Sequence, residues 1–370
     1  MATIRKIFTP IEAVHPTELI RDEMRASGMK SKELAARLGM KAPNLSRFFR
    51  TKENLTPAMA VKLEHALGIP ADYWMQLQLS YERDVEAIRR RDEEEAQAAK
   101  VESALKSALN LPLLIKKLGI ESYHFAKDKL RALYREFDVE DVDGLLALCN
   151  AQGCFKKSEA LETENRNLAT WILLARHAAT CKKDQLGPYT KGGELTAACA
   201  IAAKANNQTL TEAEISDLLA LQGIGYCVVP KTDKTPVDAY STIIDGHPFI
   251  VVSHRRNNMD MLAFDVLHEC GHINLHLAEG ISYISYNQDI NSTQGVEQEA
   301  NNFAMNALIP PEVWREIVSQ KSVSINIYSL IKVVTNEAKK RGISPTIAAW
   351  RFKYETGIYK IKGYKSRPIK

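Results

Sequence analysis

The spacing of apolar residues changes along the chain, and this change indicates which parts are helical. Up to about residue 215 apolar positions recur three and four residues apart, as in residues 130–137, which is the period of a helix buried on one face. Three short β-rich runs follow, at residues 226–230, 239–244 and 247–253. Asp245-Gly246, between the last two, has the composition of a tight turn. Helical spacing then returns, so the pattern predicts an α+β protein with a small antiparallel sheet.

Residues 1–80 have the pattern of an all-helical bundle with one distinctive turn. Gly39 separates two short helical segments, which is the arrangement of a helix-turn-helix. A purely structural helical hairpin has the same pattern, so the charge of the segment has to decide between them. From Lys30 to Lys52 seven lysines and arginines stand against the single acidic residue Glu33. This excess of positive charge favours a surface that faces the phosphates of double-stranded DNA.

The same region resembles the HigA-type antitoxins, which are repressors of the Xre/Cro class with a lambda-repressor-like bundle. The resemblance covers almost all of residues 11–78 and rests on His15-Pro16, Leu34–Gly39, Leu55–Leu63 and Ala66–Gln78. It implies that the chain binds operator DNA as a homodimer, with the start of the third helix in the major groove. The candidate DNA contacts are Lys41, Ala42 and Asn44 for base edges, Arg47 for a base or a phosphate, and Ser46, Arg50 and Lys52 for the backbone.

The chemical motif of the chain is His268-Glu269-Cys270-Gly271-His272, which lies in an apolar stretch that predicts a buried helix. On a helix His268 and His272 share one face, about 6 Å apart along the axis, and can bind one metal ion. Zinc is the expected ion. Glu269 lies about 100° around the helix and is better placed to hold a water than to bind the ion. It is therefore the candidate general base.

A catalytic zinc site needs a third protein ligand, and residues 297–304 offer one on another helical stretch. Glu297 is the preferred ligand and Glu299 is the alternative. Asn301, one turn after Glu297, is able to orient it. His276 continues the histidine face but lies about 12 Å beyond His268 on a straight helix, so a structural or substrate-facing role is expected.

This two-part pattern resembles the ImmA/IrrE family of bacterial zinc metallopeptidases. The resemblance rests on His268–His272 followed by Glu297, Ala300-Asn301, Phe303-Ala304 and Leu308–Pro310. It implies a zincin-like domain with a gluzincin-like site and a protein partner, because members of the family cleave or antagonise transcriptional repressors. Cys270 stands where the family usually has an aliphatic residue, and we expect it to pack away from the histidine face.

The mechanism expected of such a site is metal-assisted peptide hydrolysis. Zinc would lower the pKa of a bound water toward neutrality, and Glu269 would take its proton and pass it to the leaving amine. Tyr283 and Tyr286, in a predicted loop of residues 282–286, are candidates to stabilise an oxyanion. Two other functions are compatible with the sequence: a DNA-binding antitoxin or repressor whose zinc site is structural or sensory, and a scaffold with neither activity.

The sequence divides into four regions: a helix-turn-helix DNA-binding domain (1–80), a charged helical linker (81–106), a helical middle region (107–215) and a zincin-like metallopeptidase domain (216–370). The linker has eight acidic and six basic residues and almost no apolar stripe. The middle region carries no recognisable chemistry, which leaves a scaffold or partner-recognition role. Six cysteines without a C-x-x-C pair favour reduced thiols in the cytoplasm, and no apolar run is long enough to cross a membrane.

Overall fold

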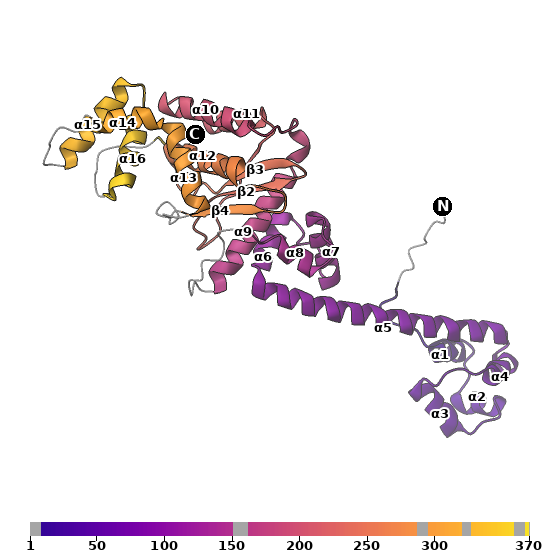
Figure 1. Ribbon diagram of the computed structural model, residues 1–370. Helices are drawn as coiled ribbons and strands as arrows, with labels where there is room; N and C mark the ends of the chain where they lie inside the picture. Colours follow the sequence, from indigo (N-terminus) through magenta and orange to yellow (C-terminus); the bar gives the residue numbers. More distant parts are fainter. Residues whose placement is uncertain (1–8, 151–161, 287–294, 320–326, 359–366, 370) are drawn as a thin grey trace. The chain divides into compact units, whose positions relative to one another are not determined.

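A computed structural model describes residues 9–150, 162–286, 295–319, 327–358 and 367–369 (Figure 1). The chain forms two compact units. Met1–Lys100 and Phe125–Lys127 belong to the first, which we call the N-terminal unit. Val101–His124 and Asp128–Lys370 belong to the second, which we call the C-terminal unit.

The N-terminal unit is an all-helical bundle, as the sequence predicts. Its core contains Ile20, Leu34, Leu63 and Trp74, all essentially inaccessible to solvent. Gly39 has a φ of 65° in the turn between the second and third helices, a conformation that favours glycine. The helices are α1 (Pro16–Ala26), α2 (Ser31–Arg37), α3 (Ala42–Thr51), α4 (Pro57–Leu67) and the first part of α5 (Ala71–Ala108).

The stretch predicted as a charged linker lies inside α5. Arg89 pairs with Glu86 at 2.8 Å and with Glu93 at 2.8 Å, three and four residues away along the helix. Such exposed pairs contribute little to the stability of a helix, and they keep this helix surface solvated.

The C-terminal unit combines helices with one sheet. The helices after α5 are α6 (Leu111–Leu118), α7 (Ala126–Phe137), α8 (Val142–Ala147), α9 (Glu162–Thr180), the 3-10 helix η1 (Lys183–Gln185), α10 (Gly193–Asn206), α11 (Glu212–Ala220), α12 (Met259–Leu275), α13 (Val296–Leu308), α14 (Pro311–Ser319), α15 (Ile327–Lys340) and α16 (Pro345–Thr356). The strands are β1 (Gly225–Val228), β2 (Val237–Ile244), β3 (His247–Val252) and β4 (Ser282–Tyr286). The architecture is therefore α+β. No helix in the described part of the chain is long and apolar enough to span a membrane.

The sheet is mixed, with strand order β1-β3-β2-β4, so the prediction of a purely antiparallel sheet is wrong for one pair. β2 and β3 form the predicted antiparallel hairpin around Asp245-Gly246, both with positive φ. β1 pairs with β3 in parallel, and β3 lies between β1 and β2. Residues 248–252 are buried on both faces, as expected of an inner strand. Alternation of apolar and polar residues does not encode strand order, so the sequence pattern cannot predict the parallel pair.

Helices cover both faces of the sheet (Figure 1). On one face Trp171 of α9 packs with Tyr240 of β2 and Phe249 of β3. On the other face α12 packs on Ala239 and Ile250, with α10 beside it. Successive strand residues point to opposite faces, so one run of sequence supplies both cores. The sheet thus supports α12, the helix that carries the histidine motif.

Candidate metal centre and DNA-contacting surface

The candidate metal centre lies where α12 and α13 cross, and Gly271 sets how closely they approach. A Cβ atom added at Gly271 would lie 3.1 Å from the Cα of Ala300 and 3.1 Å from the Cβ of Phe303. A glycine inside a helix costs about 0.5–1 kcal/mol relative to alanine, so its presence indicates a packing requirement. The close crossing brings the first turn of α13 opposite the two histidines of α12.

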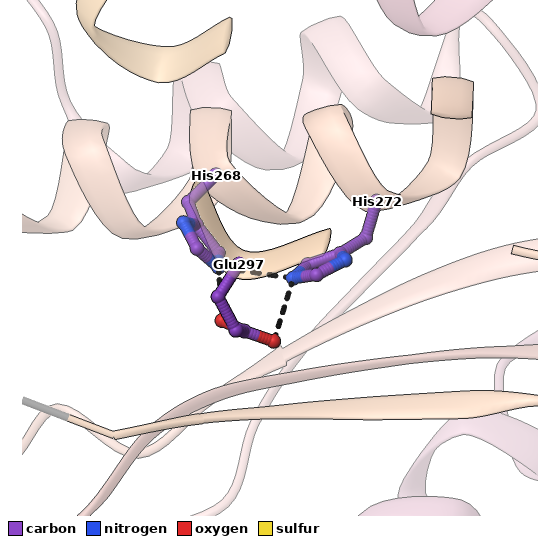
Figure 2. Close-up of side chains that lie close together, drawn as sticks. All are labelled: His268, His272 and Glu297. Carbon is purple, nitrogen blue, oxygen red and sulfur yellow. Dashed lines mark hydrogen bonds and ion pairs between the residues drawn. The ribbon is translucent and has the colours of Figure 1, made fainter. Parts of the chain in front are cut away.

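Three of the residues proposed as metal ligands converge in the structure. The Nε2 atoms of His268 and His272 are 3.0 Å apart. Glu297 places one carboxylate oxygen 3.3 Å from the first nitrogen and the other 3.5 Å from the second. Figure 2 shows both rings and the carboxylate pointing toward one another. Among the described residues, this is the group of histidine, cysteine and acidic side chains that could hold a metal ion.

The donor atoms fit a divalent cation such as zinc. The Nδ1 atom of His268 lies 3.0 Å from Oδ1 of Asn301, an acceptor, so Nδ1 carries a proton, and the neutral ring then has its lone pair on Nε2. Two lone-pair nitrogens 3.0 Å apart repel each other unless a proton or a cation lies between them. Asn301 therefore contacts His268 directly, and its expected role in orienting Glu297 stays a prediction.

The neighbours of Glu297 keep its carboxylate, the third candidate metal ligand, ionised. Burial opposes the charged form of Glu297. When the neighbouring imidazoles of His268 and His272 carry a proton in place of a cation, their attraction outweighs burial and lowers the pKa of Glu297 to about 2. Burial also disfavours the charged form of His268, yet its contacts with Glu297 and Glu269 raise the pKa of His268 above its ordinary value. A carboxylate that is already deprotonated at neutral pH is ready to bind a metal.

Glu269, the predicted general base, is completely buried beside the two histidines. The hydroxyl of Ser285 donates to Glu269 Oε1 at 2.5 Å. Among the described residues no group hydrogen-bonds to the other oxygen, Oε2. Burying a carboxylate oxygen without a hydrogen-bond partner costs free energy. The unpaired Oε2 is therefore the position expected of a group that acts on a water or a substrate.

Ser285 belongs to the strand β4, although the sequence predicts a loop at residues 282–286. The run Ser282-Tyr283-Ile284-Ser285-Tyr286 has aromatic and β-branched residues typical of a strand, and this signal could have revealed it. β4 pairs with β2 in the sheet and so brings Ser285 to Glu269. Tyr283 stacks on the ring of His272, with centroids 4.4 Å apart and planes 12° apart. The Tyr286 side chain lies outside the described residues.

The structure also gives the surroundings of three further candidate residues near the centre. Glu299, the alternative ligand, pairs with His276 at 2.7 Å. His276 ends α12 and lies 3.1 Å from His272, Nδ1 to Nδ1. Cys270 is buried in the core, as predicted, and burial raises the pKa of its thiol. No pattern in the sequence indicates that His276 and Glu299 meet, because they belong to different helices.

In the N-terminal unit, α3 presents the predicted DNA contacts to solvent. Lys41 precedes the helix, and Leu45, Phe48 and Phe49 hold its other face in the core. The candidates are all exposed: Lys41, Ala42, Asn44, Ser46, Arg47, Arg50 and Lys52.

Two of these cations already have acidic neighbours. Arg47 donates to Glu53 at 3.1 Å, and Lys52 lies 3.8 Å from Glu18. Both pairs are exposed, and such pairs are worth about 0–1 kcal/mol, so phosphates can displace the carboxylates.

Comparison with known families agrees with the two units. A helix-turn-helix model matches residues 20–74, which include α3. A model of the IrrE N-terminal-like domain, of the M78 peptidase type, matches residues 226–342, which include His268, Glu269, His272 and Glu297. A search of curated proteins found no match. The chain thus joins an Xre-like helix-turn-helix domain to an IrrE/ImmA-like peptidase-type domain.

Proposed function

We propose that the protein is a transcriptional regulator that binds operator DNA and carries a zinc-dependent endopeptidase acting on a protein partner. The observation that supports the peptidase is the convergence of His268, His272 and Glu297 beside the half-paired carboxylate of Glu269. The observation that supports DNA binding is the exposed basic surface of α3 in a segment that matches a helix-turn-helix.

The proposed site divides its work among the chain's own residues. His268, His272 and Glu297 would hold the ion, which when bound supplies Lewis acidity and lowers the pKa of water toward neutrality. Ser285 fixes one oxygen of Glu269 and leaves Oε2 to accept a proton from water. Glu269 would then donate that proton to the amine of the broken peptide bond. β4, the terminal strand of the sheet, could align a substrate as an added strand.

The substitution Glu269→Gln tests this function, because it removes the base and keeps the size of the side chain. We expect full zinc content and a loss of cleavage of about 10²-fold or more. Mass spectrometry of protein N-termini, in cells that express each form, detects cleavage even while the substrate is unidentified. N-termini that appear with the wild type and are absent with Glu269→Gln support a peptidase; identical sets of N-termini reject it.

A structural or sensory metal site is the second candidate, and the burial of the centre favours it. His272 and Glu269 have no solvent-accessible surface, and His268 retains 4%. A closed site suits an ion that holds α12 to α13 or reports metal availability. In that case Glu269→Gln changes neither the N-termini nor regulation, whereas His268→Ala removes zinc and changes DNA binding.

The resemblance of residues 11–78 to HigA-type antitoxins supports a more specific regulatory role. The protein would act in the bacterial cytoplasm as an antitoxin or repressor of its own operon, as a homodimer on a palindromic site. The partner would be a toxin or a repressor. Sedimentation of the purified protein with and without promoter DNA tests the dimer, and a monomer bound to half a site would contradict it.

A further inference from the structure

We propose that His276 and Glu299 are positioning residues that fix the tautomer and orientation of His272 and thereby set the affinity of the centre for a divalent cation. This inference rests on the proposed metal site and adds two residues to it. Neither would bind the ion, and both would act through His272.

The contacts form a continuous chain from the protein surface to the centre. Glu299 Oε2 lies 2.7 Å from Nε2 of His276. Nδ1 of His276 lies 3.1 Å from Nδ1 of His272. Nε2 of His272 in turn lies 3.5 Å from Glu297 and 3.0 Å from Nε2 of His268.

The protons in this chain follow from the acceptor at its outer end. A carboxylate only accepts, so Nε2 of His276 carries a proton that it donates to Glu299. Neutral His276 then has a lone pair on Nδ1, which accepts the Nδ1 proton of His272. His272 is left with its lone pair on Nε2, the atom that faces the other two donors. Asn301 has the same effect on His268 through a single contact.

The surroundings of His272 leave its ring little freedom to turn. Tyr283 stacks on one face of the ring, and the side chain has no solvent-accessible surface. Glu299 is 62% exposed, in the first turn of α13, so a change of its carboxylate to an amide should not disturb the core. Partners of metal-binding histidines typically contribute about 10–100-fold to metal affinity.

A merely structural pair makes a different prediction. His276 also ends α12, and its pairing with Glu299 joins α12 to α13. If that were its whole effect, substitutions would lower the thermal stability of the metal-free protein and leave the metal affinity unchanged. The affinity for zinc, measured separately from the stability of the metal-free chain, therefore distinguishes the two roles.

The test is competition for zinc between a chromophoric chelator and the full-length protein. We expect Glu299→Gln and His276→Gln each to weaken zinc binding about 10–100-fold. The double variant should be scarcely weaker than either single one, because both act through one contact. Glu312→Gln is the matched control, since Glu312 is exposed in the first turn of α14, and it should bind zinc like the wild type.

Zinc affinity of Glu299→Gln within about twofold of the wild type would overturn the inference, since it falls well short of the expected 10–100-fold loss. So would an equal loss in Glu312→Gln, which would indicate a general effect of charge. His268→Ala separates this failure from that of the metal site itself. If His268→Ala still binds zinc as the wild type does, the proposed site is wrong; if it loses zinc while Glu299→Gln does not, only the positioning role is wrong.

Discussion

The α3 surface and the metal centre carry out their proposed functions under opposite physical conditions. On α3 every candidate contact is exposed, and two of its cations rest in weak surface pairs. At the metal centre His272 and Glu269 are fully buried. His272 pairs with His276 one turn later, and Glu269 accepts a hydrogen bond from Ser285 of β4. DNA binding by the α3 surface therefore depends on net charge and tolerates small changes of geometry. Metal binding at the centre depends on atomic positions and does not tolerate small shifts.

The largest effect is expected from loss of a proposed metal ligand. Glu297→Ala should lose its zinc, because two imidazoles alone leave the ion without its third protein donor. Metal analysis of the purified protein measures this directly. Glu299→Ala is the comparison and should retain zinc at saturating concentrations. The opposite result, with zinc retained in Glu297→Ala and lost in Glu299→Ala, would reverse the choice of ligand.

A single methyl group at the helix crossing should have the next largest effect. Gly271→Ala places a Cβ against the backbone of Ala300 and should lower the free energy of unfolding by about 1–3 kcal/mol. It should also weaken zinc binding by separating Glu297 from the histidines. Denaturation in urea measures the stability. Gly187→Ala, where a Cβ would meet nothing within 4 Å, is the control and should be close to neutral.

On α3, removal of a cation should produce a graded effect. Arg47→Ala should weaken binding to promoter DNA and reduce the slope of log affinity against log salt by about 1, as expected for one lost phosphate contact. Fluorescence anisotropy at several salt concentrations measures both. Arg25→Ala removes an exposed arginine of α1 and should leave the slope unchanged. A slope that does not change in Arg47→Ala would remove this residue from the interface.

The smallest effect is expected from the acidic neighbour of Arg47. Glu53→Gln removes the carboxylate that Arg47 contacts. Arg47 can then bind a phosphate without first breaking its ion pair with Glu53. DNA binding should become tighter by about two- to fivefold, in line with the value of an exposed ion pair. Asp22→Asn breaks the similar pair with Arg25 and should have no effect. Weaker binding by Glu53→Gln would show that this pair organises the surface.

The same contrast explains what the sequence could predict. Exposed charges and a Gly39 turn are local, so the helix-turn-helix followed from the order of residues in one short segment. The HExxH motif is also local, since i and i+4 share a helix face. Glu297 came from a second helix and from a family resemblance, and the structure brings it to the histidines.

The contacts that the sequence did not reveal are those between elements. Ser285 was missed because its strand was taken for a loop, and Gly271 because its neighbours lie on α13. The parallel pairing of β1 with β3 was missed for a related reason, since the apolar pattern of a strand identifies its faces and not its neighbours. In each case the information lies in tertiary packing.

The position of β4 at the end of the strand order has one more consequence. A terminal strand is bonded to its sheet along one side, and such strands open locally at lower free energy than inner strands do. β4 carries both Ser285 and Tyr283, so its release would free the base and unstack His272 in one event. Amide hydrogen exchange along β4 should therefore report how often the centre is assembled, and a bound metal should slow that exchange.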